Sequence, residues 1–415
     1  MKNWRIKLSL LLTYFVFAIL LNSVGVVILQ VINNFDISKP SASILEGFKD
    51  LPIALVSFLV ASYLPRFGYR KALLIGLSLV TLTCLIMPQL PSFAMSKMLF
   101  LSVGIGFALV KVSVYSTVGL ITNNRQEHAS FLNIIEGFFM IGVLSGYWIF
   151  GFFINPDEPK SLDWFEVYYW LALLCSINIL LLLSTPFKQV TIAENKASAF
   201  DEFVAMIKLV KIPMVYVFVI SAFLYVLIEQ GIGTWLPTFN NEVLHLPTDI
   251  SVQVTSIFAA CLAIGRLGAG AILRRINWYV LLNACLLGMA ILVILTLPLT
   301  KDLVVNENVD WLNLPLAAWL FPFIGLFMAP IYPAINSVIL SALPQRRHAA
   351  MTGLIVLFSA LGGTTGSMIT GVVFSAFDGQ TAFYFTLLPI VIIALMLARL
   401  KSHVETNELT DAVKV

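Results

Sequence analysis

Long apolar runs alternate with short polar segments along the whole chain. Twelve of these runs are long enough to cross a bilayer as helices, because about 20 apolar residues span its hydrocarbon core. They lie at 8–33, 42–64, 71–89, 95–122, 130–154, 164–186, 212–240, 249–273, 278–298, 313–342, 349–375 and 382–400. The pattern predicts an all-α membrane protein with twelve transmembrane helices. The polar segments 188–211 and 401–415 are expected to be a cytoplasmic connector and a short, flexible cytoplasmic tail.

The composition agrees with this class. Of 415 residues, 59% are hydrophobic and 11% are charged, whereas soluble domains carry about 25% charged residues. The net charge of +3 is spread over short loops, so we expect no nucleic-acid partner. All four cysteines fall in apolar runs, and neither metal-ligand nor nucleophile–base spacing occurs. We therefore expect no metal, no cofactor and no enzyme activity, and we expect the chain to act as a monomer in the lipid bilayer.

The loop charges predict the orientation in the membrane. One set of alternate loops is basic and includes Arg66, Arg70 and Lys71, whereas the opposite set is mostly acidic and includes Asp157 and Glu158. By the positive-inside rule, both termini and the connector lie in the cytoplasm. The expected location is a cytoplasmic membrane of the bacterial (inner) type. The first run is too long for a signal-peptide core, so it is expected to remain as a transmembrane helix.

The two halves of the chain repeat each other. When the first half is shifted onto the second, three glycines fall on glycines in the fifth and eleventh runs. The pairs are Gly142 with Gly362, Gly146 with Gly366 and Gly151 with Gly371. We expect two parallel six-helix bundles at 1–187 and 212–400, with a solute site between them. Each glycine on its own is also explained by close helix packing.

Two opposite charges lie deep within consecutive predicted helices. Lys111 lies roughly 16 Å and Glu136 roughly 10 Å from the loop that joins their helices, at about 1.5 Å per residue. Charged groups at such depth are costly and usually functional. We interpret the two residues as part of a transport site, with Lys111 binding solute and Glu136 binding the coupling ion. The alternative is a buried ion pair that only fixes the helix register.

Further polar and aromatic side chains at membrane depth complete the candidate site. The predicted solute-binding residues are Lys111, Tyr115, Asn22, Gln30, Gln230, Tyr332 and Asn336. Glu229 is the second candidate for ion coupling, and Gly231 and Gly233 after it can interrupt the helix. Each Tyr or Asn is equally explained by an interhelical hydrogen bond.

Other charged side chains are assigned to the ends of helices. Arg266, near the cytoplasmic end of its helix, is interpreted as a gate or capping residue. Glu46, Lys49 and Asp50 open the second predicted helix on the outer side, where they are expected to be rim groups or solvated.

The turn SYLPRFGYRKALL resembles the signature of the major facilitator superfamily, G-x-x-x-D-R-x-G-R-[RK]. Arg66, Gly68, Arg70 and Lys71 match the pattern, whereas Pro65 replaces its aspartate. The resemblance implies the major facilitator fold and a gating role for Arg66 and Arg70. A tight basic turn also serves topology and contacts with lipid headgroups, so both explanations stand.

The second half resembles the fucose:proton symporter family and its sodium/glucose relatives. The segments that carry this resemblance are LYVLIEQGIGTWLPTF, GRLGAGAILRRI and GLFMAPIYPAINSVILSAL. It implies a sugar-type solute moved with a coupling ion, either a proton or sodium. The family's acidic residue in helix 1 is replaced near Gly25, its glutamate in helix 4 by Lys111, and its glutamine in helix 5 by Glu136. The family's proton site is therefore not transferred to this chain.

Together these patterns favour a secondary transporter over a membrane enzyme, a channel or a receptor. The family resemblance favours a neutral sugar as solute, whereas Lys111 favours a small organic anion for which it is the counter-charge. We take the proton-coupled sugar transporter as the prediction and the organic-anion transporter, for uptake or efflux, as the alternative.

Overall fold

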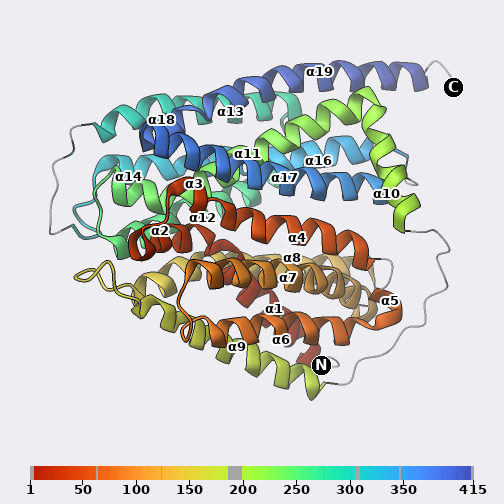
Figure 1. Cartoon of the computed structure of the whole chain (residues 1–415). Helices are drawn as coiled ribbons and strands as arrows, with labels where there is room; N and C mark the ends of the chain where they lie inside the picture. The colour runs from red at the N-terminus through yellow and green to blue at the C-terminus, as the bar shows by residue number, and fades with distance from the viewer. Residues whose placement is uncertain are drawn as a thin grey trace. The chain divides into compact units, whose positions relative to one another are not determined.

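The computed structural model describes residues 4–61, 64–122, 124–185, 199–273, 275–301, 303, 309–344 and 347–412. Within these ranges every regular element is a helix (Figure 1). Contacts between residues divide the chain into two compact units. The first is Met1–Lys196 with Pro247–Ser256, and the second is Ala197–Leu246 with Ile257–Val415. The bundle limits expected at 187 and 212 stay predictions.

The first unit is built around two central helices, α1 and α7. Its helices are α1 (Trp4–Asn22), α2 (Val24–Phe35), α3 (Lys39–Ala42), α4 (Ile44–Ala61), α5 (Leu64–Phe67), α6 (Tyr69–Ile86), α7 (Phe93–Ile121), α8 (Arg125–Phe153) and α9 (Val167–Leu183), with a 3-10 turn at Asp163–Glu166. α1 packs on α8 and α9, and α7 packs on α4 and α6 (Figure 1). The side chain of Asn178 on α9 hydrogen-bonds the hydroxyls of Ser9 and Thr13 on α1, each at 2.7 Å.

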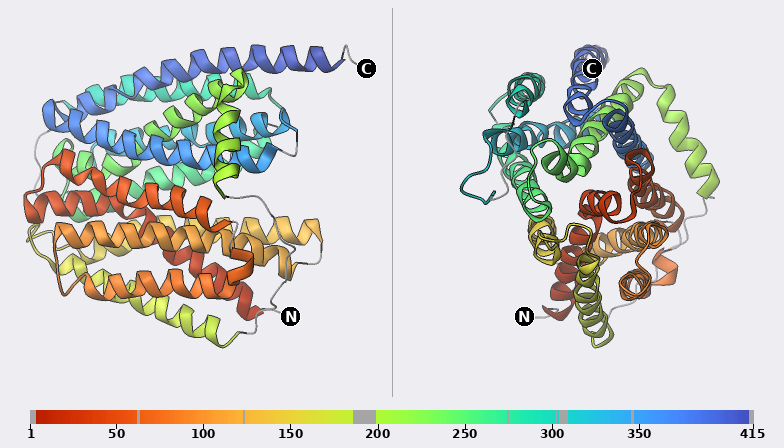
Figure 2. Two further views of the ribbon diagram at one scale, coloured as in Figure 1. Left: turned by 45° about the vertical axis from the view of Figure 1, so that its right-hand side comes forward. Right: turned by 60° about the vertical axis from the view of Figure 1, so that its left-hand side comes forward.

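The second unit is built around α11. Its helices are α10 (Ala199–Lys208), α11 (Pro213–Glu242), α13 (Trp278–Thr296), α14 (Leu316–Leu320), α15 (Ile324–Met328), α16 (Ile331–Ser341), α17 (His348–Ala376), α18 (Gly379–Tyr384) and α19 (Leu387–Ala412). α12 (Thr248–Ile272) begins in the first unit and continues in the second. α11 packs on α17, α19 and α16, and Figure 2 shows α19 as the long blue helix from two further sides.

The structure confirms the all-helical membrane fold. In the described residues, eleven segments are long and apolar enough to cross a membrane, judged by length and composition. They correspond to eleven of the twelve predicted runs, and α4, which carries three charged residues, corresponds to the twelfth. The expected flexible tail is wrong for most of its length, because α19 continues as a helix to Ala412.

Two predicted helices are interrupted in the structure, and a third is continuous where an interruption was suggested. The run 8–33 is interrupted at Ser23, whose hydroxyl donates to the carbonyl of Leu20 at 2.8 Å. The run 313–342 consists of short helices, and the last of them starts after Pro330, whose ring nitrogen has no hydrogen to donate. α11 is continuous through Gly231 and Gly233, so the interruption suggested there is wrong.

Glycines let the first and fifth helices of each repeat approach closely. A Cβ on Gly142 of α8 would collide with the carbonyl oxygen of Phe15 on α1. A Cβ on Gly362 of α17 would collide in the same way with the carbonyl oxygen of Phe223 on α11. The glycine pair recognised in the sequence therefore makes the same close contact in both units, as expected for small residues in membrane helix packing.

Side-chain caps set the starts of the two helices that carry the candidate site. Ser92 accepts a hydrogen bond from the amide of Met95 at 3.1 Å and begins α7. Asn124 accepts one from the amide of Glu127 at 2.8 Å and begins α8. Each cap satisfies an amide that the first helical turn leaves without a partner.

Candidate functional site

Lys111 lies on α7 with an exposed side chain. Its Nζ lies 5.9 Å from the centroid of the Phe107 ring, one turn earlier on the same helix. Among the described residues, no carboxylate lies within ion-pair distance of Lys111, although Glu136 is close enough to interact with it electrostatically. Lys111 therefore has no anionic side chain within 4 Å among the described residues.

Glu136 lies on α8 and is also exposed. Its Oε1 accepts a hydrogen bond from the hydroxyl of Tyr115 at 2.6 Å. The structure thus brings Lys111, Tyr115 and Glu136 together, as expected, but joins the carboxylate to the tyrosine rather than to the lysine. This arrangement does not match the alternative in which Lys111 and Glu136 form a buried pair that fixes the register.

An aromatic wall that the sequence analysis missed lies beside Tyr115 and Lys111. The ring of Tyr14 on α1 lies 6.3 Å from Tyr115, 6.1 Å from Phe107 and 5.9 Å from Phe139, measured between centroids. Aromatic residues make up 12% of the chain and occur in most of its apolar runs. Because aromatic side chains are this common here, no pattern distinguished Tyr14 before its neighbours were known.

Two polar residues from the first predicted helix face different environments. The side chain of Asn22, at the end of α1, donates to the carbonyl of Ala18 at 2.8 Å and so uses a donor within its own helix. Gln30 on α2 is 1% exposed, and neither polar atom of its amide has a hydrogen-bond partner among the described residues. Neither residue contacts Lys111, Tyr115 or Glu136 through a hydrogen bond described here, and their solute-binding roles stay predictions.

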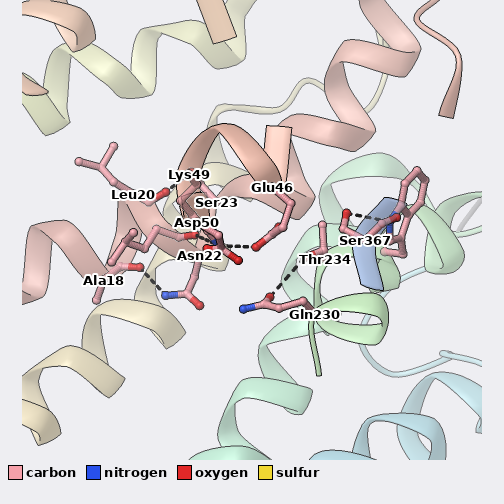
Figure 3. Close-up of polar contacts among 12 residues, drawn as sticks. Ala18, Leu20, Asn22, Ser23, Glu46, Lys49, Asp50, Gln230, Thr234 and Ser367 are labelled. Atoms are coloured by element: carbon pink, nitrogen blue, oxygen red, sulfur yellow. Dashed lines mark hydrogen bonds and ion pairs between the residues drawn. The ribbon is translucent and has the colours of Figure 1, made fainter. Parts of the chain in front are cut away.

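In the second unit, the predicted acid and base are paired with each other. Nη2 of Arg266 on α12 lies 3.0 Å from Oε1 of Glu229 on α11. Glu229 is therefore held by Arg266 in this structure, and its coupling role stays a prediction. Gln230 accepts a hydrogen bond from Thr234 at 3.4 Å on the same helix (Figure 3).

The second unit repeats the tyrosine arrangement of the first. Tyr332 on α16 stacks on Tyr225 of α11 with 5.5 Å between ring centroids, and its hydroxyl lies 2.8 Å from that of Ser359 on α17. In both units a tyrosine of the fourth helix contacts a tyrosine of the first and hydrogen-bonds a residue of the fifth. Asn336, one turn after Tyr332, has a buried Oδ1 without a hydrogen-bond partner among the described residues.

The signature turn has a backbone and a capping role. Gly68 adopts φ 95°, which disfavours residues with a side chain. Arg70 donates from Nε to the carbonyl of Leu182 at 3.1 Å and from Nη2 to that of Leu183 at 2.6 Å. It therefore holds the last turn of α9, and its gating role stays a prediction. The side chain of Arg66 lies outside the described residues.

Glu46, Lys49 and Asp50 do not form the solvated rim that was expected. All three are buried, at 0%, 6% and 9% exposure. The Nζ of Lys49 lies 2.5 Å from Glu46 and 3.4 Å from Asp50 (Figure 3). Their place near the start of the helix suggested solvent, but neighbouring helices cover them. Within the described part of the chain, no group of His, Cys, Asp and Glu is arranged to hold a metal ion.

The fold is shared with several solved transporter structures. The nucleoside transporter NupG aligns with a TM-score of 0.73 and 14% identity over 96% of this chain and 99% of NupG. A D-xylose–proton symporter aligns with a TM-score of 0.70 and 15% identity over 96% of this chain and 97% of that one. The fucose:proton symporter FucP of E. coli aligns with a TM-score of 0.60 and 15% identity over 96% and 99%.

Identities this low show a common fold and nothing more. No curated protein sequence matches the chain. The sequence profile of the Major Facilitator Superfamily matches residues 10–317, which is well over half of the chain. With the all-helical fold and the repeated helix packing, this match shows that the chain belongs to the major facilitator superfamily of transporters.

Proposed function

We propose that the protein is a secondary active transporter of a small hydroxylated solute that carries an anionic group, such as an acidic sugar. One observation supports this above all others: the exposed Lys111 has no ion-pair partner within 4 Å among the described residues. A charge at membrane depth needs compensation. An anionic solute provides it during transport, whereas a neutral solute leaves it to the protein.

Electrostatics makes this compensation strong. Two opposite charges 4 Å apart attract with about 4 kcal/mol at an effective dielectric constant of 20. Glu136 already accepts the hydroxyl of Tyr115, so an anion beside Lys111 does not have to displace an ion pair. Lys111 therefore contributes to solute affinity, and Glu136 and Tyr115 contribute acceptors and donors for hydroxyl groups.

The hydroxylated part of the solute is supported by the tyrosines and by the relatives. Tyr115 lies in the wall of the first unit, and Tyr332 lies on the corresponding helix of the second unit. The aligned structures are described as transporters of nucleosides, D-xylose and fucose. A neutral sugar is accordingly the second candidate. Two of these relatives are described as proton symporters, which supports coupling to a proton, and the loop charges support a cytoplasmic membrane with both termini inside.

A paired binding screen tests the solute class. Purified protein is heated with matched neutral and acidic solutes: glucose with glucuronate, galactose with galacturonate, and ribose with ribose 5-phosphate. We expect an acidic member to raise the unfolding temperature more than its neutral partner. Lys111→Met should weaken the binding of that acid at least about tenfold, or about 1.4 kcal/mol.

Lys97→Met is a matched control on the same helix. Lys97 lies with its Nζ 4.7 Å from the ring centroid of Phe93, the same one-turn arrangement as Lys111 and Phe107. It should leave acid binding unchanged. If only neutral members stabilise the protein, and Lys111→Met binds them as the parent does, the neutral-sugar candidate replaces the anionic one. Counterflow of the stabilising solute in proteoliposomes then separates a transporter from a receptor.

A further inference from the structure

The first predicted transmembrane run consists of two helices that meet at Ser23. α1 ends at Asn22, and α2 begins at Val24. α1 packs chiefly on α8 and α9, whereas α2 packs on α3, α4 and α7. The two halves of the run are therefore held by different neighbours, and the break lies where one set of neighbours replaces the other.

Two side chains of the run itself cap the end of α1. Asn22 Nδ2 donates to the carbonyl of Ala18 at 2.8 Å. Ser23 Oγ donates to the carbonyl of Leu20, also at 2.8 Å (Figure 3). The last carbonyls of a helix have no partner further along it, so such bonds stabilise a helix end.

Lys49 of α4 provides a third cap from outside the run. Its Nζ donates to the carbonyl of Leu21 at 3.4 Å and also lies 2.5 Å from Glu46 and 3.4 Å from Asp50. A cation stabilises the C-terminus of a helix because the last carbonyls carry the negative end of the helix dipole. This stabilisation requires α1 to end here, since in a continuous helix the carbonyl of Leu21 bonds the amide of Gly25.

The backbone of Lys49 is held in place by α7. A Cβ on Gly104 of α7 would collide with the carbonyl oxygen of Lys49 and would lie 3.2 Å from the Cβ of Pro52. α4 and α7 therefore approach each other here with no room for a side chain. The base of the lysine is fixed by these two helices, so its contact with Leu21 is the one that breaks when the end of α1 moves.

α2 is held at one end and has space beside the other. In its last turn, Asn34 accepts a hydrogen bond from Trp164 Nε1 at 2.8 Å. At its start, Ser23 and Val26 line a small recess, and Gly146 of α8 lines the same recess from the other side. A helix that is fixed at one end and has space at the other pivots about the fixed end.

We propose that the break at Ser23 is a hinge in the first transmembrane run and that Lys49 is the positioning residue that holds it in the broken form. When Lys49 releases the carbonyl of Leu21, α2 swings away from α8 and the run tends towards one continuous helix. The purpose of the hinge rests on the proposed function, because a secondary transporter opens its site to each side of the membrane in turn. α1 carries Tyr14 of the aromatic wall, so the hinge acts on a helix of the solute site.

Thiol labelling tests the hinge without any solute. Val26 is 1% exposed, so a swing of α2 away from α8 raises its exposure. In Val26→Cys protein we expect slow reaction with a small methanethiosulfonate reagent. Adding Lys49→Met should accelerate it at least about fivefold, because a cation at a partly buried helix C-terminus stabilises it by that order. Lys49→Arg, which keeps the cation, should leave the reaction slow.

Ser23→Ala is a second variant that keeps every charge of α4 and covers the case in which Lys49→Met fails to fold. It removes the cap on Leu20 and introduces a better helix former, so it should also accelerate labelling of Val26→Cys. Val27→Cys is the control, because Val27 is the next residue of α2, is equally buried and lies outside the lining of the recess. Its labelling should stay slow in both backgrounds.

Equal acceleration at the two cysteines would show a general loosening of the bundle and overturn the hinge. Unchanged labelling of Val26→Cys in folded Lys49→Met and Ser23→Ala would overturn it as well. Transport is measured separately in proteoliposomes with the acid that stabilises the protein in the paired screen. Ser23→Ala should change the rate of counterflow and leave the affinity for the acid unchanged. If the parent shows no counterflow, the proposed function fails, while the labelling result still decides whether the break is a hinge.

Discussion

At the scale of single residues, the structure separates backbone requirements from chemical roles. A Cβ added to Gly68 in the signature turn would meet no atom within 4 Å, so space is not what requires glycine there. Glycine is required there by the backbone angle φ of 95°, which residues with a side chain rarely adopt. Arg70, two positions further along the chain, holds the end of α9. The residues of the signature turn therefore have a structural role: Gly68 connects α5 to α6, and Arg70 attaches the start of α6 to the end of α9.

Replacement of Gly68 should destabilise the protein through its backbone alone. Gly68→Ala places a Cβ in a conformation that costs about 1–3 kcal/mol. We expect a lower midpoint of thermal unfolding in detergent. Gly270→Ala is the control, since Gly270 lies in α12 with an ordinary φ and open space around it, and alanine is the better helix former. Equal midpoints for the two variants would contradict the argument.

At the scale of helices, the two repeats share their close contacts but not every detail. Gly366 of α17 lies against the backbone carbonyl of Leu227, with no room for a Cβ. Its repeat partner Gly146 of α8 has its nearest neighbour, the Cα of Ile19, at 3.5 Å from a Cβ, which is ordinary contact. The same glycine position is thus obligatory in one repeat and tolerant in the other.

This difference gives a paired test. Gly366→Ala should cost about 1–3 kcal/mol, because a backbone carbonyl on α11 must move to admit the methyl group. Gly146→Ala should have little effect on the unfolding midpoint. Thermal unfolding of the two variants, measured side by side in one detergent, checks the expectation. Comparable losses in both would show that the repeats pack alike in solution.

At the scale of the whole molecule, membership of the superfamily is shown and the orientation is an expectation from loop charges. Basic residues such as Lys71 and acidic residues such as Glu158 fall on opposite sets of loops. Both side chains are exposed. All four native cysteines are buried and free, so they give a low background for cysteine labelling.

Single cysteines at these two positions should report the orientation. In right-side-out vesicles, Glu158→Cys should react with a membrane-impermeant maleimide. Lys71→Cys should react only after the membrane is permeabilised, because a basic turn is retained in the cytoplasm. The reverse pattern would place the termini outside and contradict the predicted location of the connector.

Much of the candidate site was predictable because it depends on local geometry. Lys111 and Tyr115 lie one helical turn apart, so they share a face of any helix that contains them. Glu136 follows on the next antiparallel helix at a similar depth. The hydrogen bond from Tyr115 to Glu136 was not predictable, because it depends on side-chain rotamers and on the approach of α7 to α8.

By itself, the sequence determined the class of protein, the positions of the transmembrane runs and the repeat. Each of these follows from sums over many residues: apolar content over about 20 positions and matching glycines over a whole helix. Such sums are insensitive to single contacts. The unpredicted helix breaks at Ser23 and Pro330 and the helical tail therefore did not change the predicted class, runs or repeat.

Only the tertiary structure decided which charges are buried and which are exposed. Glu46, Lys49 and Asp50 lie near the start of a helix and looked solvated, yet they are buried, whereas Lys111 and Glu136 lie deep in apolar helices and are exposed. The reason is physical: whether a side chain at membrane depth is covered depends on which helix packs against its face. Position along the chain sets depth, but neighbours from distant segments decide whether the side chain is covered by protein.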